Sequence, residues 1–287
     1  NFTTMEKVLV TGATGFIGLH CINQLLNQGY AVNGSLRSPE RKDEIFDALK
    51  NNNTPTDNLN LFTFNLTEDD GWDDGMKGCD YLIHIASPLS VKVHDEDFFV
   101  KPAVAGVKRA FKFAKKHNIK KVVLTSSVAA IFESGENKEY FDETDWSDPE
   151  NPEINHYAKS KTLAEKAAWQ FLEENGNPFE LAVINPALVV GPTLTRDLGE
   201  SNKAIGMVVT GKMPVAIPMQ FGYVDVRGDP RVRAHRPQHW HPRWRIQASP
   251  PYSLPSGPRK PPHLRQRQPS CRPRIEIQLR SNRVHQT

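Results

Sequence analysis

The chain has little cysteine and no long hydrophobic run. Its three cysteines, Cys21, Cys79 and Cys271, are scattered over 287 residues without a CxxC spacing, and an odd number does not suggest a disulfide framework. No apolar stretch approaches the roughly 20 residues that a membrane-spanning helix needs, and residues 1–7 lack a basic region followed by a hydrophobic one. We therefore expect a soluble, cytoplasmic protein with no membrane partner.

Phenylalanine and acidic residues are scarce in the last part of the chain. Residues 228–287 contain none of the 14 phenylalanines but 11 of the 22 prolines, with 13 lysines and arginines against 2 acidic residues. Leu, Ile, Val and Phe together make up 8 of these 60 residues, which is too few for a hydrophobic core. We expect a non-globular tail. A metal site at His235, His239 and His241 is not expected, because no thiol or carboxylate set accompanies them.

Two interpretations of residues 228–287 stay open. A cationic segment can bind the phosphates of nucleic acid without a fold, but we regard nucleic acid as the weaker interpretation. The other is that the segment is translated out of frame. Residues 234–241, AHRPQHWH, read one nucleotide later, are compatible with a peptide such as HIVLNTGT, which would suit the end of a helix.

From residue 5 to about residue 227, short β-branched runs alternate with amphipathic stretches. We expect strands at residues 7–11, 31–36, 59–64, 81–85, 121–125 and 180–184, and helices at 16–27 and 102–117. This alternation is typical of a parallel sheet with helices on its faces. The fold class that it predicts is α/β, a doubly wound parallel sheet of the Rossmann type.

Residues 8–18, VLVTGATGFIG, form a glycine-rich loop between the first strand and the first helix. Gly12, Gly15 and Gly18 follow a GxxGxxG spacing, in which the glycines allow a tight turn, a close backbone approach to a pyrophosphate and close packing of helix on strand. The helix then begins at Phe16 and Ile17 with unpaired N–H groups that favour phosphate. The loop predicts a dinucleotide cofactor.

The residue after the second strand discriminates between the two nicotinamide cofactors. An acidic side chain there would bind the ribose 2′-OH, whereas an arginine accepts a 2′-phosphate. The sequence has Arg37, with Arg41 and Lys42 nearby. NADP(H) is therefore favoured, with NAD(H) as the alternative.

Tyr157 and Lys161 have the YxxxK spacing, which places them one helical turn apart on the same face. Ser127 ends a strand 30 residues earlier, at the sheet edge where open α/β folds bind ligands. A phenol with its ordinary pKa near about 10 is a weak acid at neutral pH. We expect the charge of Lys161 to lower the pKa of Tyr157, which would act as general acid/base while Ser127 donates to the substrate oxygen.

With these residues the chain resembles the extended short-chain dehydrogenase/reductases, and among them the dihydroflavonol reductase, cinnamoyl-CoA reductase and aldehyde reductase group. Six segments carry the resemblance: VTGATGFIG at 10–18, HIASP at 84–88, VVLTSS at 122–127, YAKSKTLAEKAAW at 157–169, NPALVVGP at 185–192 and FGYVDVR at 221–227. Beyond Arg227 the family pattern is not recognisable. The resemblance therefore implies a Rossmann domain with part of a substrate lobe over residues 5–227, and an incomplete lobe.

The resemblance also implies roles for individual residues. Ser127, Tyr157 and Lys161 would be catalytic, with Lys161 also binding the nicotinamide ribose. Further cofactor contacts would come from Ala86 and Ser87 beside the nicotinamide, from Pro186 near it, and from Asn65 and Leu66 beside the adenine, although the family usually has Asp where Asn65 stands.

The implied activity is NADP(H)-dependent reduction of a small-molecule aldehyde or ketone to an alcohol. Two alternatives stay open: a nucleotide-sugar epimerase or dehydratase, which the sequence Val128-Ala129-Ala130 after the serine disfavours, and a cofactor-binding protein without turnover. Substrate, reaction direction and oligomeric state are not predicted.

Overall fold

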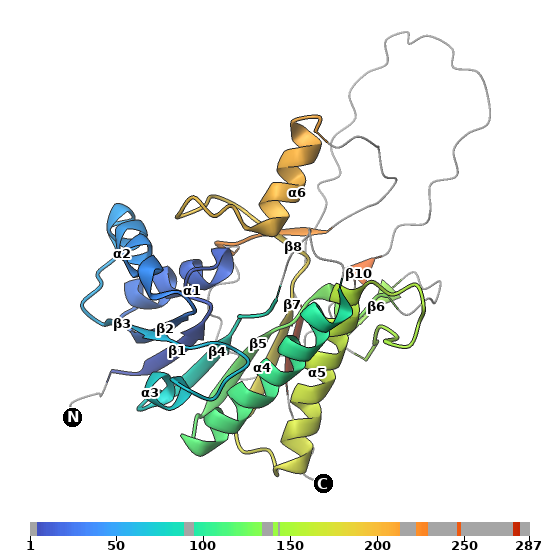
Figure 1. Ribbon diagram of the computed structural model, residues 1–287, viewed down its shortest axis with the longest axis horizontal. Helices are drawn as coiled ribbons and strands as arrows, with labels where there is room; N and C mark the ends of the chain where they lie inside the picture. Colours follow the sequence, from blue (N-terminus) through green and yellow to red (C-terminus); the bar gives the residue numbers. More distant parts are fainter. Residues whose placement is uncertain are drawn as a thin grey trace.

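The computed structural model describes residues 5–88, 95–133, 140–142, 144–212 and 222–228, together with the short strands at 246–247 and 278–281. Helices alternate with strands along most of this length (Figure 1). The helical elements are α1 (Phe16–Asn27), η1 (Pro39–Arg41), α2 (Lys42–Asn51), α3 (Trp72–Met76), α4 (Glu96–Lys116), η2 (Val128–Ala130), α5 (His156–Glu174) and α6 (Gly199–Val209). The strands are β1 (Lys7–Thr11), β2 (Ala31–Leu36), β3 (Leu59–Thr63), β4 (Tyr81–His84), β5 (Lys121–Thr125), β6 (Tyr140–Phe141), β7 (Glu180–Asn185), β8 (Leu188–Val190), β9 (Tyr223–Asp225), β10 (Ile246–Gln247) and β11 (Gln278–Ser281).

The central sheet has the strand order β11-β7-β5-β4-β1-β2-β3. All pairings from β3 to β7 are parallel, and β11 joins β7 antiparallel. The chain passes outward from β1 to β3 and then back across to β4, so the order reverses beside β1. Such a reversal is where doubly wound sheets bind their ligands, and the expected Rossmann architecture is confirmed.

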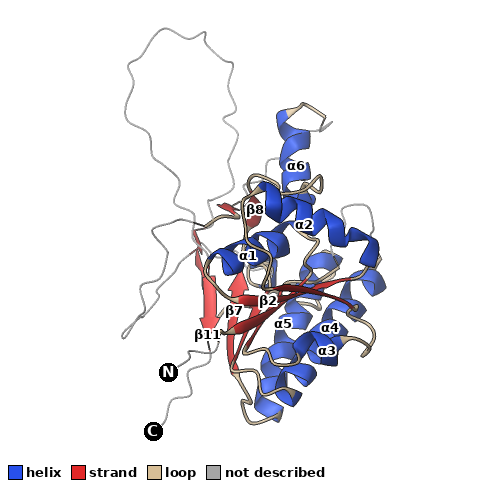
Figure 2. Ribbon diagram, turned by 90° about the vertical axis from the view of Figure 1, so that its left-hand side faces the viewer, coloured by secondary structure: helices blue, strands red, loops and turns tan. Residues whose placement is uncertain are grey.

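Helices cover both faces of this sheet (Figure 2). The first face carries α1 and α2, whose apolar side chains pack with β1 and β2 around the fully buried Ile22, Ile45 and Leu49. On the second face α3, α4 and α5 enclose a larger core that includes Phe111 and Trp72, both fully buried. Two separate cores, one on each face, fix the sheet as the middle layer.

The predicted elements agree with the observed ones except at their ends. Strands β3 and β4 end one residue earlier than expected, and β7 includes Asn185. The larger error is in α4, which begins at Glu96 rather than at residue 102. Proline favours the first turn of a helix, but Pro102 lies inside α4, and the true start is set by Asp95, whose carboxylate accepts from the backbone N–H of Asp97.

Two short strands in the last 60 residues were not predicted. The backbone of β10 pairs antiparallel with β6, and that of β11 pairs antiparallel with β7. The rest of the expected tail over 228–287 lies outside the described residues. None of the helices in the described part of the chain is long and apolar enough to span a lipid bilayer.

Candidate active site

The glycine loop makes a tight turn between β1 and α1. Gly12 has φ +81°, a left-handed conformation that favours glycine, and its carbonyl accepts from the N–H of Gly15 at 3.0 Å. A Cβ on Gly18 would lie 2.1 Å from that same carbonyl oxygen. The backbone of the loop and the first turn of α1 therefore approach each other too closely for any side chain at residue 18.

The N-terminus of α1 is open for an anion. Gly15 is its N-cap and supplies no side-chain acceptor, and the first turn contains no acidic residue. The first N–H groups of the helix, at Phe16 and Ile17, belong to the set that an α-helix leaves unpaired. Together with the helix dipole they form a site suited to a pyrophosphate.

The two arginines after β2 differ in their surroundings. Arg41 forms a bidentate ion pair with Glu44 at 2.8 and 3.1 Å and also reaches the carbonyl of Thr14. Arg37 is exposed directly after β2, and no described residue forms a hydrogen bond or ion pair with it. Its guanidinium is therefore the one available to bind an anionic group at this end of β2.

The loop after β4 is anchored to β1. The hydroxyl of Thr11 accepts from the backbone N–H groups of Ile85 and Ala86 at 3.0 and 3.1 Å. This places Ala86 close to Gly12, where an added Cβ would lie 3.5 Å from the Ala86 backbone. The loop that begins with Ala86 and Ser87 therefore lies beside the glycine loop.

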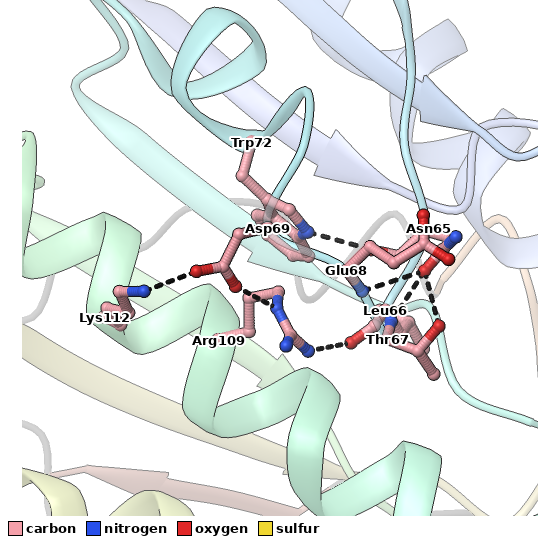
Figure 3. A network of polar contacts seen from close by, with 8 residues as sticks. All are labelled: Asn65, Leu66, Thr67, Glu68, Asp69, Trp72, Arg109 and Lys112. Carbon is pink, nitrogen blue, oxygen red and sulfur yellow. Dashed lines mark hydrogen bonds and ion pairs between the residues drawn. The ribbon is translucent and has the colours of Figure 1, made fainter.

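Asn65 and Leu66 lie in a turn after β3 that a polar network holds in place (Figure 3). The Oδ1 atom of Asn65 accepts from the N–H and the hydroxyl of Thr67, at 2.7 and 2.8 Å, and from the N–H of Glu68 at 3.1 Å. Arg109 of α4 donates to the carbonyl of Leu66. The oxygen of Asn65 is fully used within the turn, which leaves its amide N–H₂ as the group available to a ligand.

The catalytic candidates meet where β5 ends and α5 begins. Ser127 and Lys161 are each 7% exposed, and the Lys161 ammonium lies 5.8 Å from the centre of the Tyr157 ring. It also lies 3.4 Å from the carbonyl oxygen of Thr125. Asn155 caps α5 by accepting from the N–H of Ala158 at 2.9 Å, which fixes where the helix starts and so the position of Tyr157.

Burial controls the proton affinities in this cluster. It raises the pKa of Tyr157, and a hydrogen bond with Ser127 opposes the rise only in part. Burial also lowers the pKa of Lys161 to about 8, partly offset by the charge of Glu165. The pKa of Tyr157 is thus raised overall, opposite to the net direction that we expected, because loss of solvation of the phenolate outweighs the Ser127 hydrogen bond. The contribution of the Lys161 charge itself stays a prediction.

A small pocket, partly open to solvent, joins several of these groups. Its lining includes Ala86 and Ser87 from the loop after β4, Ser126 after β5, and Lys161 and Glu165 of α5. The sheet order places the remaining candidates in line with the pocket: Gly12 follows β1, Arg37 follows β2 and Asn65 follows β3. Adjacent parallel strands thus bring all these residues to one edge, which suits an elongated ligand.

Sequence reasoning missed Glu165 and Asn185. Both are fully buried, and the Asn185 amide donates to Glu165 at 2.8 Å and to the carbonyl of Ser127 at 3.1 Å. Pro186, the next residue, accepts from the N–H of Val128 at 3.1 Å. The position of Glu165, four residues after Lys161 on the same helix, was a signal in the sequence. An i, i+4 pair does not reveal, however, that the glutamate is buried.

Residues 8–217 match the NAD dependent epimerase/dehydratase family. The chain belongs to this family. It is an extended short-chain dehydrogenase/reductase, as the glycine loop, the sheet order and the Ser127, Tyr157 and Lys161 cluster indicate together. One member, dihydroflavonol 4-reductase of Arabidopsis thaliana, is 38% identical over 238 residues, which cover 80% of this chain and 61% of that protein.

A second member is the NADPH-dependent methylglyoxal reductase of Saccharomyces cerevisiae, 34% identical over 245 residues, or 77% of this chain and 71% of that protein. The crystal structure of yeast methylglyoxal/isovaleraldehyde reductase complexed with NADPH superposes with a TM-score of 0.67 at 33% identity, covering 77% of this chain and 71% of that chain. The family member from Arabidopsis is matched over 61% of its length and cinnamoyl-CoA reductase 1 of Petunia hybrida over 66%. The chain therefore spans about two thirds of such reductases.

Proposed function

We propose that this protein is an NADP(H)-dependent oxidoreductase that reduces an aldehyde or ketone to an alcohol. The observation that carries the proposal is the row of groups at the carboxyl edge of the sheet. It runs from Arg37 through the glycine loop to the cluster of Ser127, Tyr157 and Lys161. Relatives named as NADPH-dependent reductases support the same cofactor and reaction class.

The residues present fit NADPH. The glycine loop and the open N-terminus of α1 would hold the pyrophosphate, since a Cβ at residue 18 has no room and no acid opposes the phosphates. Arg37 would bind the 2′-phosphate, because Arg41 is already paired with Glu44. Leu66 and the Asn65 amide would contact the adenine, and Ala86, Ser87 and Pro186 would lie beside the nicotinamide.

When bound, the cofactor supplies a hydride to the carbonyl carbon. Tyr157 would donate its proton to the oxygen of the substrate, and the Ser127 hydroxyl, already next to that phenol, would donate a hydrogen bond to the same oxygen. The Lys161 ammonium would bind the nicotinamide ribose and favour the phenolate left behind. Burial of Tyr157 suits this role, because a neutral phenol is the form that must be present before the transfer.

Two alternative functions predict different behaviour. An epimerase or dehydratase would act on a nucleotide sugar and return its cofactor to the starting state. A binding protein without turnover would hold NADP(H) but leave every carbonyl compound unchanged. We favour the reductase because Ser127, Tyr157 and Lys161 lie together where β5 ends and α5 begins, and because relatives named as reductases match most of the chain.

The test begins with fluorescence titrations of the full chain with NADPH and NADH. Replacing Arg37 by Ala should weaken NADPH binding at least about tenfold, the value of a charge-assisted hydrogen bond to a phosphate, and leave NADH binding unchanged. Lys50→Ala is the matched control, since it removes one exposed positive charge at the end of α2. Equal losses for both cofactors would contradict the assignment of Arg37.

Turnover is then measured as oxidation of NADPH with short aldehydes and ketones. Tyr157→Phe should abolish it while leaving NADPH binding intact. Cofactor binding without turnover in the unmodified chain would favour the non-catalytic alternative. Release of a keto or epimerised nucleotide sugar would favour the epimerase or dehydratase.

We also propose that the reductase part ends near Arg227. The family match ends at residue 217, and the composition changes at residue 228. Sequencing the gene and its transcript tests the out-of-frame interpretation. A single frame encoding this same sequence through Gly228 in both would contradict it.

A further inference from the structure

Glu165 is a carboxylate buried inside the candidate active site. It lies one helical turn after Lys161 on α5 and is 0% exposed. Its Oε2 accepts from the amide of Asn185 at 2.8 Å, and its Oε1 from the indole N–H of Trp169 at 3.5 Å. Glutamate is almost never fully buried without a partner for its charge, so its surroundings indicate what it does.

Asn185 links Glu165 to the loop that carries Ser127. Its side-chain nitrogen uses one hydrogen on Glu165 and the other on the carbonyl oxygen of Ser127, at 3.1 Å. Its Oδ1 is buried and has no hydrogen-bond partner in the described part of the chain. A buried oxygen without a partner lowers the free energy of unfolding by about 1–3 kcal/mol. A gain in stability therefore does not by itself explain the Asn185 bridge.

Lys161 faces few charged groups besides Glu165. Helix α5 also contributes the Tyr157 phenol, β4 contributes His84, whose pKa of about 3 keeps it neutral, and the end of β5 contributes the Thr125 carbonyl and the Ser126 hydroxyl. The pocket wall from α4 is apolar. Among the described residues that line this pocket, Glu165 is thus the one with a carboxyl group.

We propose that Glu165 is a positioning residue, whose buried carboxylate keeps Lys161 in its charged form and, through Asn185, ties α5 to the Ser127 loop. The proposal rests on the reductase function in one respect, because Lys161 needs its charge to favour the tyrosinate after proton transfer. Glu165 itself moves no proton. Without it, burial alone would act on Lys161 and favour the neutral amine.

The test follows the protonation of Lys161 directly, in the full chain without cofactor or substrate. Carbon-13 NMR of lysine-labelled protein, with the signal assigned by Lys161→Arg, gives the pKa of Lys161. In Glu165→Gln we expect this pKa to fall from about 8 by about one pH unit or more. Glu165→Asp, which keeps the charge, should restore most of the shift, and Glu173→Gln, at an exposed position of α5, should change nothing.

The same variants give a second readout if the chain reduces carbonyls. The fall of kcat/KM at high pH should begin at lower pH in Glu165→Gln but not in Glu173→Gln. An unchanged pKa of Lys161 in Glu165→Gln would overturn the proposal. A Glu165 carboxyl that is protonated at pH 7 in the unmodified chain would also overturn the proposal. Its carbon-13 shift measures this state and tests the proposal even if the Glu165→Gln variant does not fold. Neither result depends on turnover, so failure of the reductase function is seen separately.

Discussion

The hydroxyl of Thr11 donates its proton to Nδ1 of His84. The two atoms lie 3.0 Å apart, and the same hydroxyl accepts from the backbone N–H groups of Ile85 and Ala86. A hydroxyl has two lone pairs and one proton, so with both lone pairs used the proton points at the ring. His84 is therefore a neutral imidazole that carries its hydrogen on Nε2.

This neutral histidine should make the fold sensitive to acid. Burial, and then the charge of Lys161, lower the pKa of His84 from 6.5 to about 3. Because the unfolded chain takes up this proton first, stability is complete above about pH 6.5 and falls below it, by up to about 1.4 kcal/mol per pH unit. Urea unfolding between pH 4.5 and 6.5 should show this slope, and His84→Gln should reduce it. Equal slopes in both proteins would contradict the assignment.

Gly18→Ala should damage both the fold and the cofactor site. The new methyl group would meet the Gly12 carbonyl at 2.1 Å, so the loop must move. Overpacking of this kind costs about 1–3 kcal/mol, and we expect NADPH binding to weaken at least tenfold. Gly206→Ala in α6, where a Cβ meets nothing within 4 Å, is the control and should be neutral or slightly stabilising. Chemical unfolding and NADPH titration measure both effects.

Asn65→Asp should strengthen NADPH binding several-fold. One oxygen would still accept the three hydrogen bonds of the turn, while the second would accept from the adenine amino group, a contact worth about 1 kcal/mol. The control is the hypoxanthine analogue of NADPH, which lacks that amino group and should gain nothing. A gain shared by both cofactors would point instead to a change in the turn.

Lys161→Met combined with Glu165→Gln should stabilise the protein although it removes the proposed catalytic ammonium, because the buried carboxylate is then not left without its partner. Burial holds the pKa of Lys161 near 8, below its ordinary value of 10.5, so the folded state below pH 8 bears the penalty of a buried charge. We expect the free energy of unfolding to rise by about 1–3 kcal/mol at pH 7. The difference between the proteins should shrink as the pH rises from 8 toward 10.5. A variant less stable than the parent at pH 7 would show that the ammonium is well compensated.

Elements with strong local signals could be predicted from the sequence. The strand at 7–11, the strand at 31–36 and the helix at 16–27 have their predicted bounds, because apolar periodicity and the three glycines act over a few residues. The start of α4 could not be predicted from Pro102, because the Asp95 cap lies well before it in the chain. Strand β10 is too short to leave a pattern, and β11 was missed although Ile275, Ile277 and Leu279 alternate with polar residues, because the composition of residues 228–287 argued against any sheet there.

By itself the sequence determined the Rossmann order of elements, the phosphate loop and the helical pairing of Tyr157 with Lys161, since each depends on near neighbours in the chain. Only the tertiary structure decided which arginine is available and that Glu165 and Asn185 belong to the site. It also decided in which direction the pKa of Tyr157 moves. Asn185 lies 58 residues from the Ser127 carbonyl that it binds, and burial exists only once helices and sheet have packed. Contacts and desolvation of this kind leave no local pattern in a sequence.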